Sequence, residues 1–253
     1  MAKDSRRIGA PRPYMEFVDL SLKLWHSLHK FKRRINIEGR SFVVPPGVFI
    51  PEGVWTSKLL TRHLRVRGGD KVLDLGSGCG VQAVHAALKG GYVVAVDHNP
   101  RALEAVKLNA LLNGVADRVE TRLGDLFEPV EEELFDLIIF SPPYIPKEPR
   151  SILESAWRGG ARLEVVRRFI YQAPSFLKDD GRIQMVYSSL GNIQWLLSII
   201  RKEFKAKVTY RLRLPYEQII LLEAWKTWHE EPVKTFSIQA LKTLSEDEGR
   251  IIT

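Results

Sequence analysis

The chain has 253 residues, of which 45% are hydrophobic and 27% charged, enough to bury a full α/β core. No apolar run is long enough to cross a bilayer, and no secretion signal follows the basic start. The single cysteine excludes an internal disulfide and a cysteine-based zinc cluster. We therefore expect a cytoplasmic protein with no membrane segment and no metal site. The net charge of +8 is concentrated in residues 1–40, where ten Lys or Arg face four Asp or Glu; this basic arm is either a solvated terminus or a contact for a polyanion such as RNA.

Residues 1–50 predict a small basic extension made of a helix and a short hairpin. Apolar residues recur at helical spacing from Tyr14 to Arg34. We expect Trp25 and Phe31 in the core of this unit, with a role as stacking platforms as the alternative. Short strands at 35–37 and 41–44 flank a Glu38-Gly39 turn. After the break at Pro45-Pro46-Gly47, a further helix is expected near 56–64.

Strand and helix patterns alternate through the expected main domain, residues 51–226. Strands are predicted at 71–75, 92–97, 118–123, 135–140, 182–187, 207–213 and 217–225, with helices at about 80–89, 100–113, 161–176 and 191–204. This order predicts an α/β fold with a doubly wound, mostly parallel, seven-stranded Rossmann-like sheet. Only a short segment around Pro215 separates the last two strands, so we expect a hairpin with one antiparallel edge strand. Residues 227–253 are expected to form a tail or a peripheral helix.

A glycine-rich turn follows the first strand of this sheet, in Asp74-Leu75-Gly76-Ser77-Gly78-Cys79-Gly80. Glycines there allow a ligand to approach the backbone. The next strand ends in Asp97, at the spacing where a carboxylate can accept both ribose hydroxyls. After the third strand, Asp125 is placed to accept an adenine amino proton and Leu126 to cover the ring. Carboxyl ends of neighbouring strands are where open α/β sheets bind ligands, so these segments predict a nucleoside cofactor.

Two kinds of cofactor compete for this site. A nicotinamide dinucleotide normally takes a G-x-G-x-x-G turn, which brings a pyrophosphate onto a helix N-terminus. Here the glycines run G-x-G-x-G, and no catalytic His or Tyr-Lys pair stands out. The pattern therefore favours a methyl donor.

The fourth strand runs into Ser141-Pro142-Pro143-Tyr144, the candidate catalytic segment. A conjugated amino nitrogen is a poor nucleophile, and accepting hydrogen bonds from both of its N–H groups turns the lone pair toward an electrophile. The Ser141 hydroxyl and the Pro142 carbonyl can serve as these acceptors, and consecutive prolines hold them extended. Tyr144 can stack on a planar substrate near a sulfonium charge. The alternative is a proline-rich turn without a catalytic role.

At these residues the chain resembles the class I S-adenosylmethionine-dependent amino-methyltransferases with an (Asn/Asp/Ser)-Pro-Pro-Tyr motif, over about residues 48–226. It is most similar to HemK/PrmC-type proteins, which methylate a glutamine of translation release factors; the segments 159–162 and 50–52 share in that similarity. The resemblance implies S-adenosylmethionine as the cofactor. The candidate residues around it are Thr56, Asp74, Gly76, Ser77, Gly78, Gly80, Asp97, His98, Asp125, Leu126 and Ser141, with a surface role as the alternative for His98.

One position departs from the glutamine methylases. They and most adenine methylases begin the motif with Asn, whereas this chain has Ser141, similar to methylases of the N4 amine of cytosine. Methylation of cytidine N4 in ribosomal RNA is therefore the leading expectation. A release-factor glutamine methyltransferase, an RNA adenine-N6 methyltransferase and a non-catalytic RNA-binding module remain alternatives. Arg150, Arg158 and Arg162 are either phosphate contacts or solvated residues.

Overall fold

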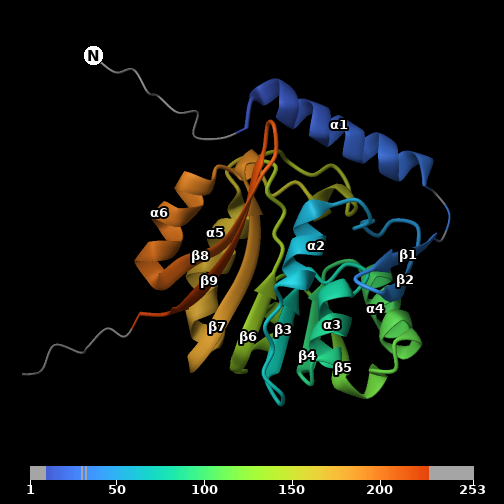
Figure 1. Cartoon of the computed structure of the whole chain (residues 1–253), viewed down its shortest axis with the longest axis vertical. Helices are drawn as coiled ribbons and strands as arrows, with labels where there is room; N and C mark the ends of the chain where they lie inside the picture. Colours follow the sequence, from blue (N-terminus) through green and yellow to red (C-terminus); the bar gives the residue numbers. More distant parts are fainter. Residues whose placement is uncertain (1–9, 30, 32, 228–253) are drawn as a thin grey trace, which may run out of the picture.

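A seven-stranded β-sheet crosses the molecule in the computed structural model, which describes residues 10–29, 31 and 33–227 (Figure 1). The strand order is β5-β4-β3-β6-β7-β9-β8. The strands are β3 (Lys71–Leu75), β4 (Tyr92–Asp97), β5 (Val119–Leu123), β6 (Phe135–Phe140), β7 (Leu177–Ser188), β8 (Phe204–Arg213) and β9 (Gln218–Lys226). Strands β3 to β7 pair in parallel, and β9 runs antiparallel to both β7 and β8. The expected fold class is confirmed. The reversed strand, β9, is the inner strand of the hairpin at this edge, and β8 is the outermost strand of the sheet.

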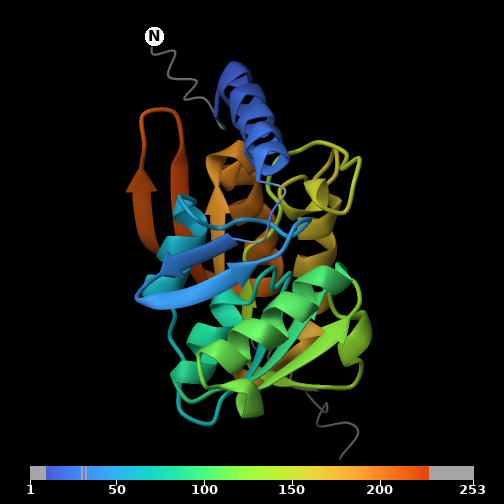
Figure 2. The ribbon, with the colours of Figure 1, turned by 90° about the vertical axis from the view of Figure 1, so that its right-hand side faces the viewer.

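Helices cover both faces of the sheet (Figure 2). Residues of α2 (Trp55–Arg62), α3 (Val81–Leu88) and α4 (Pro100–Leu112) share one apolar cluster with one set of alternating strand residues. On the opposite face, α5 (Glu164–Gln172) and α6 (Ile193–Glu203) pack in a second cluster. Short 3₁₀ turns lie at Ala116–Arg118, Glu128–Val130, Glu154–Ala156, Ala173–Phe176 and Ser189–Gly191.

Side-chain caps mark where α4 and α6 begin. The Asn99 side chain accepts a hydrogen bond from the Arg101 N–H at 3.1 Å, and Pro100 occupies the first turn of α4. Asn192 caps α6 in the same way, accepting from the Trp195 N–H at 3.0 Å. The strands carry apolar side chains on both faces because both faces are covered, as a parallel sheet requires.

The hairpin of β1 (Arg33–Ile37) and β2 (Arg40–Val44) joins the main core through buried side chains such as Phe42. The Asn109 side chain of α4 bonds the Val43 N–H at 2.7 Å, the Val43 carbonyl at 2.9 Å and the Cys79 carbonyl at 2.8 Å. The predicted hairpin is therefore present, as a separate two-stranded sheet held against α4. The division at residue 50 stays a prediction.

Helix α1 (Arg12–Leu28) lies across the end of the sheet to which the parallel strands point (Figure 1). Its polar Asp19 and His26 are buried, while Trp25 is 38% and Phe31, just after the helix, 84% exposed. The expectation that Trp25 and Phe31 belong to a core is therefore wrong, because the helix turns its polar side inward. Apart from Thr227, the predicted tail at 227–253 lies outside the described residues. None of the helices in the described part is long and apolar enough to span a bilayer.

Candidate active site

A cavity of about 580 Å³ opens at the carboxyl ends of the parallel strands. It is lined by the turn after β3, the end of β4, the residues after β5 and the motif after β6. The four segments selected from the sequence thus meet in one space. The lining includes twelve of the predicted residues: Thr56, Gly76, Ser77, Gly78, Asp97, His98, Asp125, Leu126, Ser141, Pro142, Pro143 and Tyr144.

The glycine turn presents bare backbone to this cavity. Gly76 and Gly78 have φ values of 64° and 55°, and a Cβ built on either would meet no heavy atom within 4 Å. The positive φ explains why glycine is used, and the open space is where a ligand can approach. The Ser77 hydroxyl donates to the Asp74 carbonyl at 2.8 Å and fixes the turn.

Gly80 and Asp74 do not line the cavity. Gly80 begins α3 with φ of 83°, and a Cβ there would lie 3.1 Å from Val106, so this glycine permits close packing of α3 against α4. Asp74 is 2% exposed beneath the turn, and its Oδ2 has no hydrogen-bond partner. Burial raises the pKa of Asp74 to about 7, since the charged form is poorly solvated there.

Asp97 is held in a fixed orientation at the end of β4. Its Oδ2 accepts from the Gly78 N–H and its Oδ1 from the Asn99 N–H, both at 2.8 Å. Burial raises the pKa of this carboxyl, and the backbone hydrogen bonds partly oppose that shift. Each carboxylate oxygen keeps a further lone pair, so the side chain can still accept hydroxyl donors from a ligand.

The adenine end of the predicted site is more exposed. Asp125 receives the Arg168 guanidinium at 2.6 Å, so its carboxylate already has one partner. Leu126 adopts φ of 51° and is 7% exposed, which places a rigid apolar side chain at the wall. His98 shares a 2.8 Å hydrogen bond with Ser155. The proposed contacts of Asp125, Leu126 and His98 with a cofactor remain predictions.

The Ser-Pro-Pro-Tyr segment is tightly supported from behind. Tyr144 packs edge-on against Tyr187, with ring centroids 6.2 Å apart. Burial raises the pKa of the Tyr144 phenol well above its ordinary value, and the charge of Glu217 adds to this, so the ring stays neutral. A Cβ on Gly159 would collide with the Pro143 carbonyl oxygen. This glycine therefore allows the following loop to pack directly on the motif.

Tyr14 and Glu217 are among the lining residues that were not selected from the sequence. Glu217, between β8 and β9, accepts from the Ser188 hydroxyl at 2.5 Å and from the Tyr14 hydroxyl at 3.3 Å. Burial raises its pKa. Both Tyr14 and Glu217 line the cavity, which places a carboxyl group at the same end as Tyr144. No motif marks either residue, because each reaches the site only through tertiary packing.

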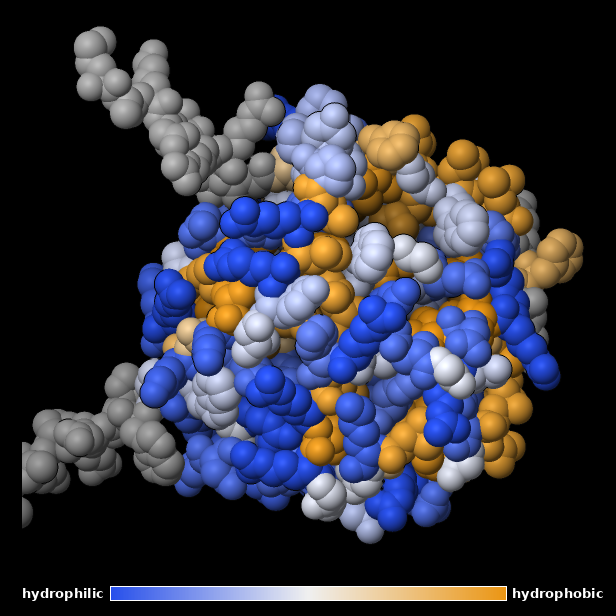
Figure 3. Space-filling model, in the orientation of Figure 1, coloured by the Kyte–Doolittle hydropathy of each residue, from blue (hydrophilic) through white to orange (hydrophobic). Residues whose placement is uncertain are grey.

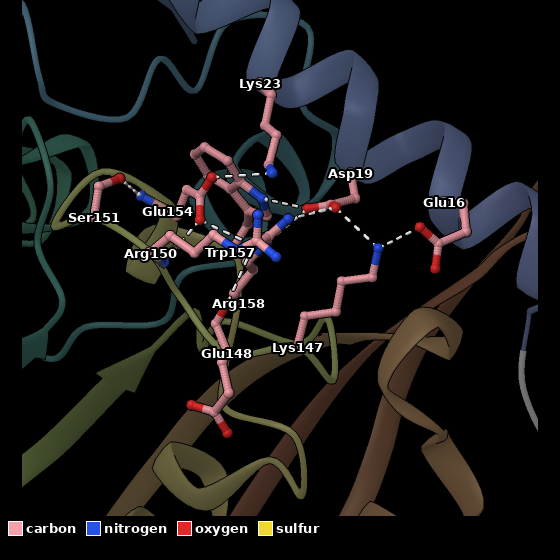
Figure 4. A network of polar contacts seen from close by, with 10 residues as sticks. All are labelled: Glu16, Asp19, Lys23, Lys147, Glu148, Arg150, Ser151, Glu154, Trp157 and Arg158. Carbon is pink, nitrogen blue, oxygen red and sulfur yellow. Dashed lines mark hydrogen bonds and ion pairs between the residues drawn. The ribbon is translucent and has the colours of Figure 1, made fainter.

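A buried polar network joins α1 to the loop after the motif (Figure 4). Asp19 accepts from Arg158 Nε and Nη2 at 2.8 and 2.6 Å, from Trp157 Nε1 at 3.0 Å and from Lys147 Nζ at 3.0 Å. Burial alone would raise the pKa of Asp19, but these hydrogen bonds together lower it well below its usual range. Arg158 is only 5% exposed and is paired with Asp19 of α1, so it is neither a phosphate contact nor a solvated residue.

The residues present fit a nucleoside cofactor with a cationic tail. Among the described residues, neither Asp74 nor Asp97 forms an ion pair with a lysine or an arginine. Sulfonium and ammonium groups compensate carboxylates of this kind. The fold, the bare glycine turn and the motif beside it define an S-adenosylmethionine-dependent amino-methyltransferase.

Comparison with known proteins supports this assignment. A family model described as "Methyltransferase small domain" matches residues 39–210, and the chain belongs to this family. A putative protein N5-glutamine methyltransferase of Methanocaldococcus jannaschii is 36% identical over 199 residues, covering 76% of this chain and 98% of that protein. A release factor glutamine methyltransferase of Aquifex aeolicus is 39% identical, covering 74% and 71%. Two other glutamine methyltransferases match over part of their length, and the chain covers 53% of one and 61% of the other.

A solved structure shares both the fold and the cofactor class. The 16S rRNA N2 methyltransferase of T. thermophilus, in complex with AdoMet and guanosine, is 25% identical with a TM-score of 0.60, covering 78% of this chain and 50% of that one. The predicted cofactor is therefore confirmed. The names of these relatives point to glutamine in proteins or to N2 in ribosomal RNA, and none of the names mentions cytidine N4.

Proposed function

We propose that this protein methylates the side-chain amide nitrogen of a glutamine in a protein substrate. The observation that carries the proposal is the shared cavity, in which the Ser141–Tyr144 segment faces the same space as the glycine turn. The Methanocaldococcus relative, matched over 98% of its length, is named as a putative protein N5-glutamine methyltransferase, which favours glutamine over a base.

In this proposal the chain's own groups align and activate the acceptor nitrogen. The Ser141 hydroxyl oxygen and the Pro142 carbonyl accept the two amide N–H groups, and the neutral Tyr144 ring covers the amide plane. The cofactor supplies an electrophilic methyl group on its sulfonium. Alignment provides most of the rate, because the attacking lone pair is directed along one approach. The nitrogen releases its proton readily after reaction, so no strong base is required.

Ser141 favours a second candidate, methylation of cytidine N4 in ribosomal RNA. A hydroxyl is smaller than the amide of an asparagine and leaves a deeper pocket, as in methylases of cytosine N4. The basic residues 1–40 are compatible with an RNA substrate. RNA adenine N6 is a further alternative for the same motif.

Methyl transfer from tritiated S-adenosylmethionine to separated total RNA and total protein tests these proposals. We expect label in a protein band that survives nuclease, identified as a release factor or a ribosomal protein methylated at glutamine. The Tyr144→Ala variant is the inactive control. Label confined to nuclease-sensitive material would overturn the glutamine proposal and support an RNA base. A lack of calorimetric signal with S-adenosylmethionine would contradict an enzymatic role altogether.

A further inference from the structure

The amphipathic pattern of helix α1 is inverted. Phe17, Leu20, Leu24 and Leu28 follow one another at intervals of three and four residues, so they share one face. They are 65%, 66%, 57% and 68% exposed, and Phe31 beyond the helix is 84% exposed. We call these five residues the outer stripe. Hydrophobic side chains gather along the upper edge of the molecule, where α1 lies (Figure 3).

Ion pairs on the inner face hold this orientation. Asp19 is buried against Arg158, and Lys23 pairs with Glu154 at 3.1 Å (Figure 4). Lys147 bridges Asp19 and Glu16. A helix that rolled to bury the outer stripe would have to withdraw Asp19 from the buried Arg158 and leave this cation with Glu154 as its remaining carboxylate partner, which is costly. The exposure of the stripe is therefore built into the fold.

The outer stripe is continuous with the active-site mouth. One flank of α1, formed by Tyr14, Val18 and Leu22, lines the cavity that holds the Ser-Pro-Pro-Tyr segment. On the other flank, Phe17 and Leu20 line a second groove between α1 and the loop that carries Lys147 and Arg158. A molecule lying on the stripe can therefore reach into the cavity beside it. Helix α1 also lies outside residues 39–210, the part that matches the family.

The chemistry of the stripe favours a protein over RNA. RNA binding depends on cations free to contact phosphates. The stripe consists of leucine and phenylalanine, and three neighbouring cations, Lys23, Lys147 and Arg158, are already paired with carboxylates. Contiguous exposed apolar patches mark contacts with proteins, membranes or ligands, and the outer stripe offers no charge for a phosphate backbone.

The area of the stripe favours a substrate over a second copy of the chain. A large apolar side chain has roughly 150–200 Å² of surface, and these five expose more than half of theirs, about 500–700 Å² together. Two stripes facing each other would bury roughly 1,000–1,400 Å² of apolar surface, close to the lower limit of stable interfaces. A substrate adds its contacts inside the cavity to those on the stripe.

We propose that the outer stripe of α1 docks the body of the protein substrate, which lays an apolar segment along it while the acceptor glutamine enters the cavity on the adjacent flank. This inference rests on the proposed function. It assigns to α1 the selection of the substrate protein, and leaves activation of the nitrogen to the motif after β6.

The test compares two acceptors and two matched variants of the full chain. One acceptor is the intact release factor from the cells that make this protein. The other is a short peptide that contains the Gly-Gly-Gln sequence of that factor. The test variant is Leu24→Lys with Leu28→Lys. The control is Leu111→Lys with Leu112→Lys on α4, where the leucines are 68% and 49% exposed. Initial rates with tritiated S-adenosylmethionine give KM and kcat for each pair.

We expect the test variant to raise KM for the intact factor about tenfold or more, with kcat and the peptide kinetics unchanged, and the control to match the unaltered chain. An unchanged KM for the intact factor overturns the docking proposal alone, and so does an equal loss with the peptide, which would place the effect in the cavity. If the unaltered chain methylates neither acceptor, the proposed function fails and this inference fails with it. If total RNA is the acceptor and the test variant changes its KM while the control does not, the stripe binds nucleic acid, and this result also overturns the docking proposal.

Discussion

Replacement of Asp74 by asparagine should stabilise the cofactor-free protein at neutral and alkaline pH. Asp74 is fully enclosed beneath the glycine turn, its Oδ2 has no partner, and burial raises its pKa to about 7. The carboxylate is therefore retained at a cost in stability. The Asp74→Asn change keeps the size of the side chain and removes the ionisation.

The expected magnitude follows from the pKa difference. The folded protein holds the Asp74 proton more tightly than the unfolded chain, whose pKa is near the ordinary 3.8. The protonated Asp74 therefore makes its full contribution to the free energy of unfolding below about pH 4, and this contribution is lost as the pH rises toward 7. Three pKa units correspond to roughly 4 kcal/mol, so the advantage of Asp74→Asn should grow by about that amount between pH 4 and pH 8.

Urea unfolding of both proteins from pH 4 to pH 8, with and without S-adenosylmethionine, measures this effect. The cofactor should narrow the difference at pH 8, because a positive charge in the cavity favours the charged form of the nearby carboxylate without contacting it. Calorimetry should show weaker cofactor binding by the variant. Parallel stability curves across the whole pH range would refute the reasoning, since they would mean that Asp74 ionises normally in the folded state.

Four further changes probe the cofactor site, the motif and the anchor of α1, and a fifth serves as a control. In calorimetry, Asp97→Ala should weaken cofactor affinity about 10-fold or more, because hydrogen bonds to the cofactor are lost. In initial-rate assays, Tyr144→Ala should suppress turnover more than it weakens cofactor affinity. An equal loss of turnover and affinity in the Tyr144 variant would contradict these separate roles. Gly159→Ala should cost about 1–3 kcal/mol in thermal unfolding and reduce turnover, because the new Cβ displaces the Pro143 carbonyl. Asp19→Ala should cost about 3 kcal/mol or more in urea unfolding, while the exposed Glu16→Ala should cost less than about 1 kcal/mol; equal effects would argue against a buried anchor.

The sheet and the cofactor segments could be predicted because their signals are local. The apolar run 135–140 precedes the motif directly, and the turn after β3 and Asp97 after β4 stand at strand ends. Topology brings such ends together without any knowledge of side-chain packing. Strand β7 was predicted too short, at 182–187, because Asp179-Asp180-Gly181 resembles a turn, although the strand continues through it from Leu177.

The remaining parts of the site depend on contacts between distant segments. Helical spacing predicts α1 but not its orientation, since apolar residues lie on both sides of it. Only the position of Arg158 and Trp157 shows that Asp19 faces inward. In the same way, Glu217 reaches the cavity because its turn folds beside Ser188 and Tyr14, and no spacing in the sequence predicts this. For Gly80, the contact with Val106 that explains it lies on another helix.

The position of β9 has a consequence for how the chain folds. This strand is the last described element, yet it lies between β7 and β8, which both precede it in the sequence. During synthesis, β7 can pair with β6 but must wait for residues 218–226 before its second edge is satisfied. A ribosome-bound chain stopped before β9 should therefore expose two unpaired strand edges and bind chaperones, and release of the last residues should complete the sheet.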